Sequence, residues 1–137
     1  MGRIVVIGGS YGEITMIGAP ALAANAALRS GAGLVQLMVP ADIRSAVATL
    51  SPCSTIRILP TTAVDVFGAV EDYHTDGVVL GPGLVTSLSG DVLIDFLGRF
   101  NGPVVACCVP VMATPSRRPS HMPVAIVAGT PGRNVSR

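Results

Sequence analysis

The sequence predicts an α/β fold in which a mostly parallel sheet is wound in both directions, with helices on its two faces. Short apolar segments typical of buried strands alternate with segments of helical composition, and the connections between them are short. The first and fourth strand segments also run into glycine-rich turns. Ligands of such folds bind beyond the carboxyl ends of the strands, so we expect the ligand site at these turns.

The first half of the chain is predicted to form two strands and two helices. Arg3 to Ile7 is a β-branched, continuously apolar run, as in strands that are covered on both faces. A helix is expected over Pro20 to Arg29, because this run is rich in helix formers and begins with a proline that suits a first turn. Leu34 to Val39 is the second expected strand; it is closed by Pro40 and followed by a helix over Asp42 to Leu50.

The second half continues the alternation up to about residue 105. Thr55 to Leu59 is expected to be a strand, and Val64 to Tyr73 has the apolar spacing of a helix. Gly77 to Leu80 is an apolar strand that enters the second glycine-rich turn. Asp91 to Phe100 supplies another helix, and a fifth strand begins within Pro103 to Val105. Both glycine-rich turns therefore follow buried strands.

Residues 106–137 are predicted to form an irregular tail. Their prolines fall too densely for a helix or a central strand, and Val124 to Val127 alone has the composition of a short strand. No acidic residue follows Asp95, and the tail is basic through its arginines. Because the tail contains no aromatic residue on which bases could stack, we expect no binding of nucleic acid.

Composition excludes further classes of protein. The chain contains no lysine, which the phosphate-binding P-loop requires. Its three cysteines, Cys53, Cys107 and Cys108, form no CxxC pair or disulfide ladder, and this favours a reducing, cytoplasmic location. The longest apolar stretch, Val104 to Ala113, is interrupted by Pro110 and cannot cross a bilayer, so no membrane partner is expected.

The titratable residues indicate neither a metal site nor a catalytic centre. His74 and His121 lie far apart in the sequence and lack metal-ligand companions, so no metal is expected. Acidic residues in the middle of the chain are expected to form a solvated surface. These residues are Asp65, Glu71, Asp72 and Asp76.

The glycine-rich turns are the candidate ligand site. Glycines at a strand-to-helix turn let the backbone approach a phosphate or another bulky ligand; alternatively, they serve only the geometry of the turn. A dinucleotide-binding GxGxxG fingerprint is absent, because the order here is GGSYGEITMIGA and the second strand ends in Val39-Pro40. A Rossmann-type oxidoreductase, which would need Asp42 as its ribose-binding acid, stays open as an alternative.

The sequence contains GGSYGEITMIGAPALAANAALRSGAGLV, then a strand that ends in Pro40, and later DGVVLGPGL. Together these three segments resemble the NAD(P)H-hydrate dehydratases. The resemblance covers residues 2–105 and includes the Leu50-Ser51-Pro52 step at the family's spacing. It implies a three-layer ribokinase-like parallel sheet flanked by helices, C-terminally truncated, with an irregular tail over 106–137.

The resemblance implies a lyase reaction of nicotinamide nucleotide repair. Hydrated NADH or NADPH, a small-molecule substrate, is dehydrated at the expense of ADP or ATP with Mg²⁺, and the family is expected to be homo-oligomeric. Carried over residue by residue, the substrate-binding positions are Gly18, Ala19, Gly81 and Gly83. Possible further loop contacts are Gly8, Gly9 and Ser10.

The sequence departs from the family pattern at three places. The segment between Ser10 and Gly18 is longer than in the family, and Val85 replaces the last glycine of GPGLG. After Val105 the family's Asp-Ala-Asp, TPHxGE, Lys-Gly and GTGD motifs are absent, and the last of these carries the catalytic Asp. General acid–base chemistry needs a titratable group, so we assign no catalytic residue and expect an inactive chain.

Two hypotheses follow from these departures. The first is a change of reading frame near residue 106, which the nucleotide sequence downstream would test. The second is that the chain is a non-catalytic α/β nucleotide-binding or assembly module that pairs with a partner supplying the missing strands. An unpaired sheet edge would favour such association.

Overall fold

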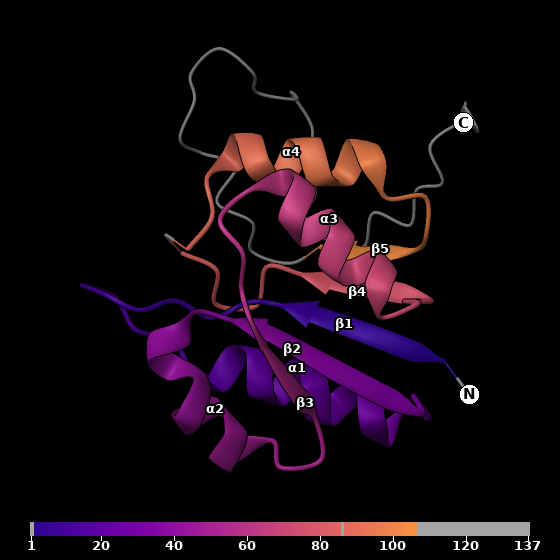
Figure 1. The fold of residues 1–137 in the computed structure, drawn as a ribbon. Coiled ribbons are helices and arrows are strands. Elements are labelled where there is room, and N and C mark those ends of the chain that lie inside the picture. The colour runs from indigo at the N-terminus through magenta and orange to yellow at the C-terminus, as the bar shows by residue number, and fades with distance from the viewer. Residues whose placement is uncertain (1, 86, 107–137) are drawn as a thin grey trace, which may run out of the picture.

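The computed structural model describes residues 2–85 and 87–106, which form a five-stranded sheet with helices on both faces (Figure 1). All strands run parallel in the order β3-β2-β1-β4-β5, which confirms the predicted α/β fold for this part of the chain. The strands are β1 (Arg3–Ile7), β2 (Leu34–Val39), β3 (Thr55–Ile58), β4 (Gly77–Leu80) and β5 (Val104–Ala106). The helices are α1 (Gly18–Arg29), η1 (Ala41–Ile43), α2 (Arg44–Leu50), α3 (Ala63–Asp72) and α4 (Gly90–Arg99).

β1 lies at the centre of the sheet because its side chains are apolar on both faces. Val5, Val6 and Ile7 are all 0% exposed, and they alternate between two separate cores. Val6 packs on the side of α1 and α2, whereas Val5 and Ile7 pack on the side of α3 and α4. A strand with this pattern must be covered twice, which is why the molecule has three layers.

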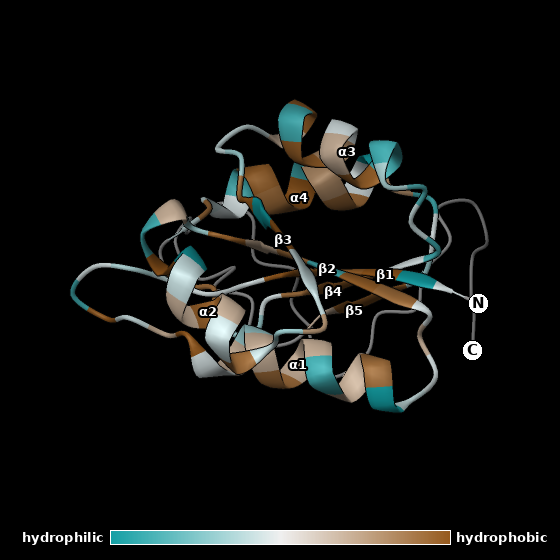
Figure 2. Ribbon diagram, turned by 60° about the horizontal axis from the view of Figure 1, so that its bottom comes forward, coloured by the Kyte–Doolittle hydropathy of each residue, from teal (hydrophilic) through white to brown (hydrophobic). Residues whose placement is uncertain are grey.

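The helices are divided between the two faces of the sheet (Figure 2). Between the sheet and α1 and α2 the core contains small side chains, such as Ala21 and Ala24 of α1 and Val47 of α2. Between the sheet and α3 and α4 the core is larger and includes Val66 and Phe96. The small side chains let α1 lie close to the sheet, next to β1 and β2.

The winding direction reverses between β1 and β4. From β1 the chain passes through β2 to β3 on one side, then returns through α3 to β4, which pairs with the other side of β1. In open α/β sheets, a crevice forms at such a reversal, beyond the carboxyl ends of the two strands. The carboxyl ends of β1 and β4 are followed by the two glycine-rich turns.

The structure corrects the predicted start of α1, which lies at Gly18 rather than at Pro20. Pro20 packs against the first glycine turn, since a Cβ built on Gly8 would lie 3.3 Å from the Cβ of Pro20. This packing holds the preceding residues in helical conformation despite the low helix propensity of glycine. The expected strand at Val124 to Val127 and the rest of the predicted tail lie outside the described residues.

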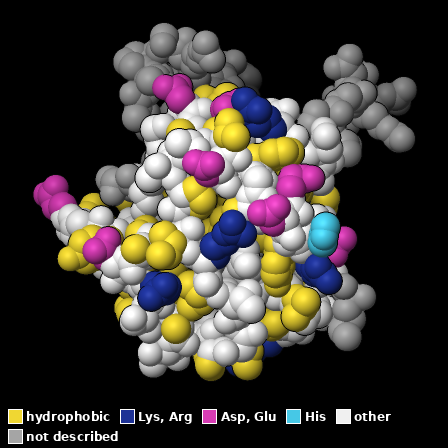
Figure 3. All heavy atoms as spheres, viewed as in Figure 1, with side chains coloured by type: hydrophobic (Ala, Val, Ile, Leu, Met, Phe, Trp, Pro, Cys, Tyr) yellow, Lys and Arg dark blue, Asp and Glu magenta, His cyan; other side chains and the backbone are white. Residues whose placement is uncertain are grey.

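The acidic residues of the middle of the chain are exposed, as expected, and Asp72 and Asp76 have structural partners. An oxygen of Asp72 lies 3.9 Å from Arg57, and Asp76 accepts a hydrogen bond of 2.7 Å from the backbone N–H of Arg3. Figure 3 shows acidic and basic side chains scattered over this face among apolar ones. These carboxylates therefore form no centre of their own.

We expect Thr62→Ala to lower the free energy of unfolding by about 1 kcal/mol. Thr62 is the N-cap of α3, and its Oγ1 accepts a hydrogen bond of 3.2 Å from the backbone N–H of Asp65. Urea denaturation checks the value. Thr61→Ala is the matched control, because Thr61 is exposed and caps no helix, and equal losses in the two variants would contradict the capping role.

Candidate functional site at the reversal point

Two glycine turns meet at the reversal point between β1 and β4. The first glycine turn (Gly8, Gly9, Ser10) follows β1, and the second glycine turn (Gly81, Pro82, Gly83) follows β4. The N–H of Gly9 donates to the Pro82 carbonyl at 2.8 Å, and the N–H of Gly81 donates to the Ile7 carbonyl at 2.9 Å. The topology thus brings together segments that are more than seventy residues apart in the sequence. Ser87 Oγ likewise donates a 2.8 Å hydrogen bond to the carbonyl of Gly9, 78 positions earlier.

The turns pack so closely against each other and against neighbouring residues that side chains would not fit. A Cβ added to Gly8 would lie 2.3 Å from the carbonyl oxygen of Pro82, and one added to Gly9 would lie 2.7 Å from Ile43 Cδ1. At Gly83, an added Cβ would lie 3.0 Å from the Cβ of Met16. All of these glycines are buried. They therefore serve the packing of the turns, whatever they contribute to a ligand.

Backbone conformation gives a second reason for glycine at three of these positions. Gly9, Gly81 and Gly83 have φ of 81°, 111° and 71°, which side-chain-bearing residues rarely adopt. Val85, which replaces a glycine of the family pattern, is not in this region, since His74 is the one described non-glycine residue with positive φ. The substitution at Val85 therefore leaves the turn unstrained.

Most backbone donors of the turns are already used. The N–H of Gly8 donates to Met38 O at 3.1 Å, and the N–H groups of Leu84 and Val85 donate back to Gly81 and Gly83. Ser10 is buried, and its Oγ donates to Ile14 O at 3.0 Å. Together with the Gly9 and Gly81 hydrogen bonds, these internal bonds leave few donors of the two turns for a ligand.

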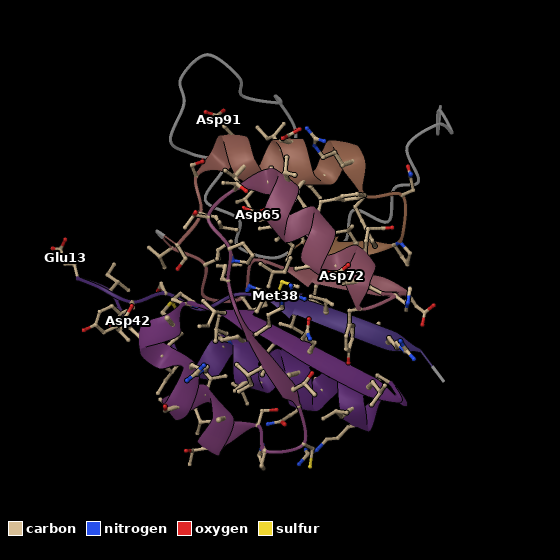
Figure 4. All side chains as sticks on the ribbon, viewed as in Figure 1. Glu13, Met38, Asp42, Asp65, Asp72 and Asp91 are labelled. Atoms are coloured by element: carbon tan, nitrogen blue, oxygen red, sulfur yellow. The ribbon has the colours of Figure 1, made fainter. Side chains whose placement is uncertain are left out.

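The residues between the first glycine turn and α1 form a closed loop. Ser10 and Met16 face each other in an antiparallel bridge, with Met16 N donating to Ser10 O at 3.0 Å and Ser10 N donating to Met16 O at 3.3 Å. Residues 11–16 are exposed, and Figure 4 shows Glu13 at the outer end of this loop, with Asp42 closer to the sheet on the same side. This loop thus projects from the body of the molecule.

The start of α1 is the part of the site that remains open. Gly18 and Ala19 are partly exposed, and a Cβ added to Gly18 would meet nothing within 4 Å. Ile17, the N-cap residue, provides no side-chain hydrogen bond, and the first turn contains no acidic residue. The first N–H groups of a helix have no partner within the helix and carry partial positive charge. The N–H groups of this terminus can therefore donate hydrogen bonds to a ligand or bind its anionic groups.

Three of the predicted substrate-binding segments lie side by side. A Cβ built on Gly83 would lie 3.3 Å from the Cβ of Ala19, so the start of α1 adjoins the second glycine turn, which in turn contacts the first. Sequence reasoning missed Met16 and Ser87, which hold the turns in place. Neither role can be recognised from the local sequence. Ser87 bonds to Gly9, which is distant in the sequence, and Met16 bonds to Ser10 across the exposed loop.

The fold and the packed glycine turns define an α/β protein with a candidate ligand site at the reversal point of its sheet. The family profile described as NAD(P)H-hydrate dehydratase matches residues 4–108. The ADP-dependent (S)-NAD(P)H-hydrate dehydratase of Natrialba magadii is 35% identical over 108 residues, covering 76% of this chain and 40% of that protein. The chain belongs to the NAD(P)H-hydrate dehydratase family.

One further relative agrees with this family, and one solved structure agrees with the fold. The bifunctional NAD(P)H-hydrate repair enzyme Nnr of Dictyoglomus turgidum is 32% identical over 117 residues, covering 76% of this chain and 21% of that protein. The crystal structure of hypothetic protein SMU.573 from Streptococcus mutans matches with a TM-score of 0.61 at 24% identity, covering 75% of this chain and 36% of that one. The chain thus spans less than half the length of these relatives.

Proposed function

We propose that the chain binds hydrated NADH or NADPH, the damaged nicotinamide nucleotides, at the reversal point between β1 and β4. The single observation that carries the site is the contact between the start of α1 and the second glycine turn, at Ala19 and Gly83. Family membership supports the identity of the ligand, because the relatives are named as dehydratases and repair enzymes of hydrated NAD(P)H.

The predicted site residues take two different roles in this proposal. Gly18 and Ala19 are partly exposed and offer unpaired N–H groups, so they contact the nucleotide, whose phosphates suit a helix N-terminus. The two glycine turns are buried and form the floor below them. The absence of a side chain at Gly18 leaves space for the ligand. At Gly8 and Gly83 the corresponding space is filled by neighbouring residues of the protein.

The proposed activity of this chain alone is binding without dehydration. Residues 106–137 contain no Asp or Glu, so this segment supplies no carboxylate that could act as a general base. The resemblance implies ADP or ATP with Mg²⁺ as the co-reactant, and the Natrialba magadii relative is named as ADP-dependent. Among the described residues no group of three or more His, Cys, Asp or Glu could hold a metal ion, so we assign no Mg²⁺ to this part.

Gly18→Leu tests the proposed site. The leucine side chain would enter the open space above α1, so we expect the dissociation constant for hydrated NADH to rise at least about tenfold, which is about 1.4 kcal/mol. Isothermal titration calorimetry on the purified 137-residue chain measures this constant. Stability should not fall, because leucine is a better helix former than glycine.

Gly98→Leu is the matched control for this experiment. Gly98 is also a helical glycine with nothing within 4 Å of an added Cβ, but it lies in α4, away from the site. We expect it to bind the nucleotide as the unchanged chain does. Equal binding by the Gly18 variant and the unchanged chain, or no binding of hydrated NADH by the unchanged chain, would overturn the proposal.

Three further assignments belong to the same proposal. We place the boundary of the family domain near residue 105, with the tail over 106–137 outside it, and the family match ends close by at residue 108. No helix among residues 2–85 and 87–106 is both long and apolar enough to cross a membrane. Action in the cytoplasm on a small molecule, within a homo-oligomer, fits a family of metabolite repair.

A further inference from the structure

The connection from α4 to β5 contains an exposed asparagine that is followed by glycine. Asn101 and Gly102 lie between the end of α4 at Arg99 and the start of β5 at Val104. Neither the side chain of Asn101 nor the backbone N–H of Gly102 forms a hydrogen bond with another described residue. Within the described part of the chain, no hydrogen bond therefore restrains these two groups.

An asparagine side chain and the backbone nitrogen that follows it can react with each other. When this nitrogen loses its proton it attacks the side-chain carbonyl carbon, a succinimide ring closes, and the carboxamide nitrogen leaves as ammonia. Water then adds to either carbonyl of the ring and opens it. One opening gives aspartate, and the other gives isoaspartate, in which the main chain runs through the side-chain carbonyl. A following glycine favours ring closure, because it has no Cβ and a permissive backbone.

The other asparagine among the described residues is held in a different environment. Asn25 lies within α1 and is followed by Ala26. Its Nδ2 donates to Leu50 O at 3.1 Å, and its Oδ1 accepts a hydrogen bond of 2.9 Å from Ser51 Oγ. Ring closure at Asn25 requires both hydrogen bonds to break and the helix to open locally. The chain thus contains an internal reference for the reactivity of Asn101.

Packing holds glycine at position 102. A Cβ added to Gly102 would lie 2.5 Å from Phe100 Cζ and 2.7 Å from its Cε1. Phe100 is 4% exposed, and its ring stacks on that of Phe96 at an interplanar angle of 11°, so moving it would disturb a packed core. A larger residue would slow ring closure but would displace this ring. The reactive pair is therefore tied to the core beneath α4.

We propose that Asn101 is a site of spontaneous modification, at which attack by the Gly102 nitrogen produces aspartate and isoaspartate. Water is the co-reactant and ammonia the leaving group, so no oxidant or reductant is needed. The new carboxyl group is ionised at neutral pH and lowers the formal net charge of the chain from +1 to zero. The inference is independent of the proposed function, because no nucleotide takes part.

The modification acts on the attachment of β5 to the sheet. The new charge lies just beyond the C-terminus of α4, where the helix dipole disfavours an anion. Arg99 in the last turn is already paired with Asp95 at 3.0 Å. Isoaspartate also lengthens the main chain shortly before Pro103, whose carbonyl accepts a 3.0 Å hydrogen bond from Val78 N. We therefore expect β5 to be held less tightly against β4 after modification.

Ageing the purified 137-residue chain in mildly alkaline buffer tests the modification. Trypsin cleaves after Arg99, so mass spectrometry follows the peptide that begins at Phe100, and chromatography separates the aspartate and isoaspartate products. We expect conversion at Asn101 to be at least about tenfold faster than at Asn25, because α1 must first open locally. The rate should rise with pH, since the attacking nitrogen must lose its proton.

Asn101→Gln is the control variant, because its longer side chain would have to close a larger ring. Its mass and charge should stay constant during ageing. The unchanged chain aged in urea gives the rate of the unfolded sequence, and we expect the native rate to lie within about tenfold of it, since no local opening is required. A slower native rate, or equal conversion at Asn101 and Asn25, would overturn the proposal.

A second measurement tests the effect on β5. The aged chain and Asn101→Asp should both unfold at a lower urea concentration than Asn101→Gln aged for the same time. Hydrogen exchange at the Val78 N–H should be faster in the aged chain, because its acceptor, the Pro103 carbonyl, is displaced. Unchanged unfolding and exchange in a chain that is fully modified would refute the effect on β5 and leave the modification site standing.

Discussion

Gly8→Ala is expected to destabilise the protein by about 3 kcal/mol or more, because the new methyl group has no space. It would lie 2.3 Å from the carbonyl oxygen of Pro82, which belongs to the backbone and cannot rotate away. Relief requires separating β1 from the second glycine turn, and this breaks the 2.8 Å hydrogen bond from Gly9 N to Pro82 O. Urea denaturation followed by circular dichroism measures the loss.

Gly68→Ala is the control for this prediction. Gly68 lies in the middle of α3 and an added Cβ would meet nothing within 4 Å, so alanine should stabilise the protein by about 0.5–1 kcal/mol through its helix propensity. The same chemical change thus has opposite signs at the two positions. A Gly8→Ala variant as stable as the unchanged chain would show that the turns do not touch as described.

Phe96→Ala is expected to cost about 3–5 kcal/mol. Phe96 is 1% exposed, lies between α4 and the sheet, and stacks on Phe100 with ring centroids 5.7 Å apart. Its removal leaves a cavity in the buried core that also contains Leu93 of the same helix. Thermal and urea unfolding should both shift by the corresponding amount.

Leu22→Ala provides the comparison on the other face of the sheet. Leu22 lies on α1 and is 71% exposed, so its truncation should change the stability by less than about 0.5 kcal/mol. A loss at Leu22 comparable with that at Phe96 would mean that the outer face of α1 is buried in solution, for example against another copy of the chain.

The sequence predicts the elements of this fold well because each depends on local patterns. The β-branched run of β1 and the alanine-rich composition of α1 are visible without any knowledge of neighbours. The helix start was misplaced by two residues, since Gly18 is a weak helix former that is held by the packing of Pro20 against the first glycine turn. Tertiary contact, not propensity, decides that boundary.

The candidate site is less predictable, because it depends on which strands become neighbours. Two glycine turns can be found in the sequence, but their contact follows from the return of β4 to the side of β1. The sequence also does not reveal that the turns use their donors internally, so that the open donors belong to Gly18 and Ala19. The resemblance to the family selected candidate positions that the fold places side by side, without distinguishing the buried turns from the partly exposed start of α1.

The bridge between Ser10 and Met16 separates the length of the first loop from the position of α1. Because the chain is clamped on both sides of residues 11–16, adding or removing residues between the clamps changes only a loop-closure entropy that grows slowly with length. This loop can therefore diversify among family members while α1 stays in place. It is also a natural attachment point for a fluorescent reporter, with Glu13 at its outer end and the rest of the fold undisturbed.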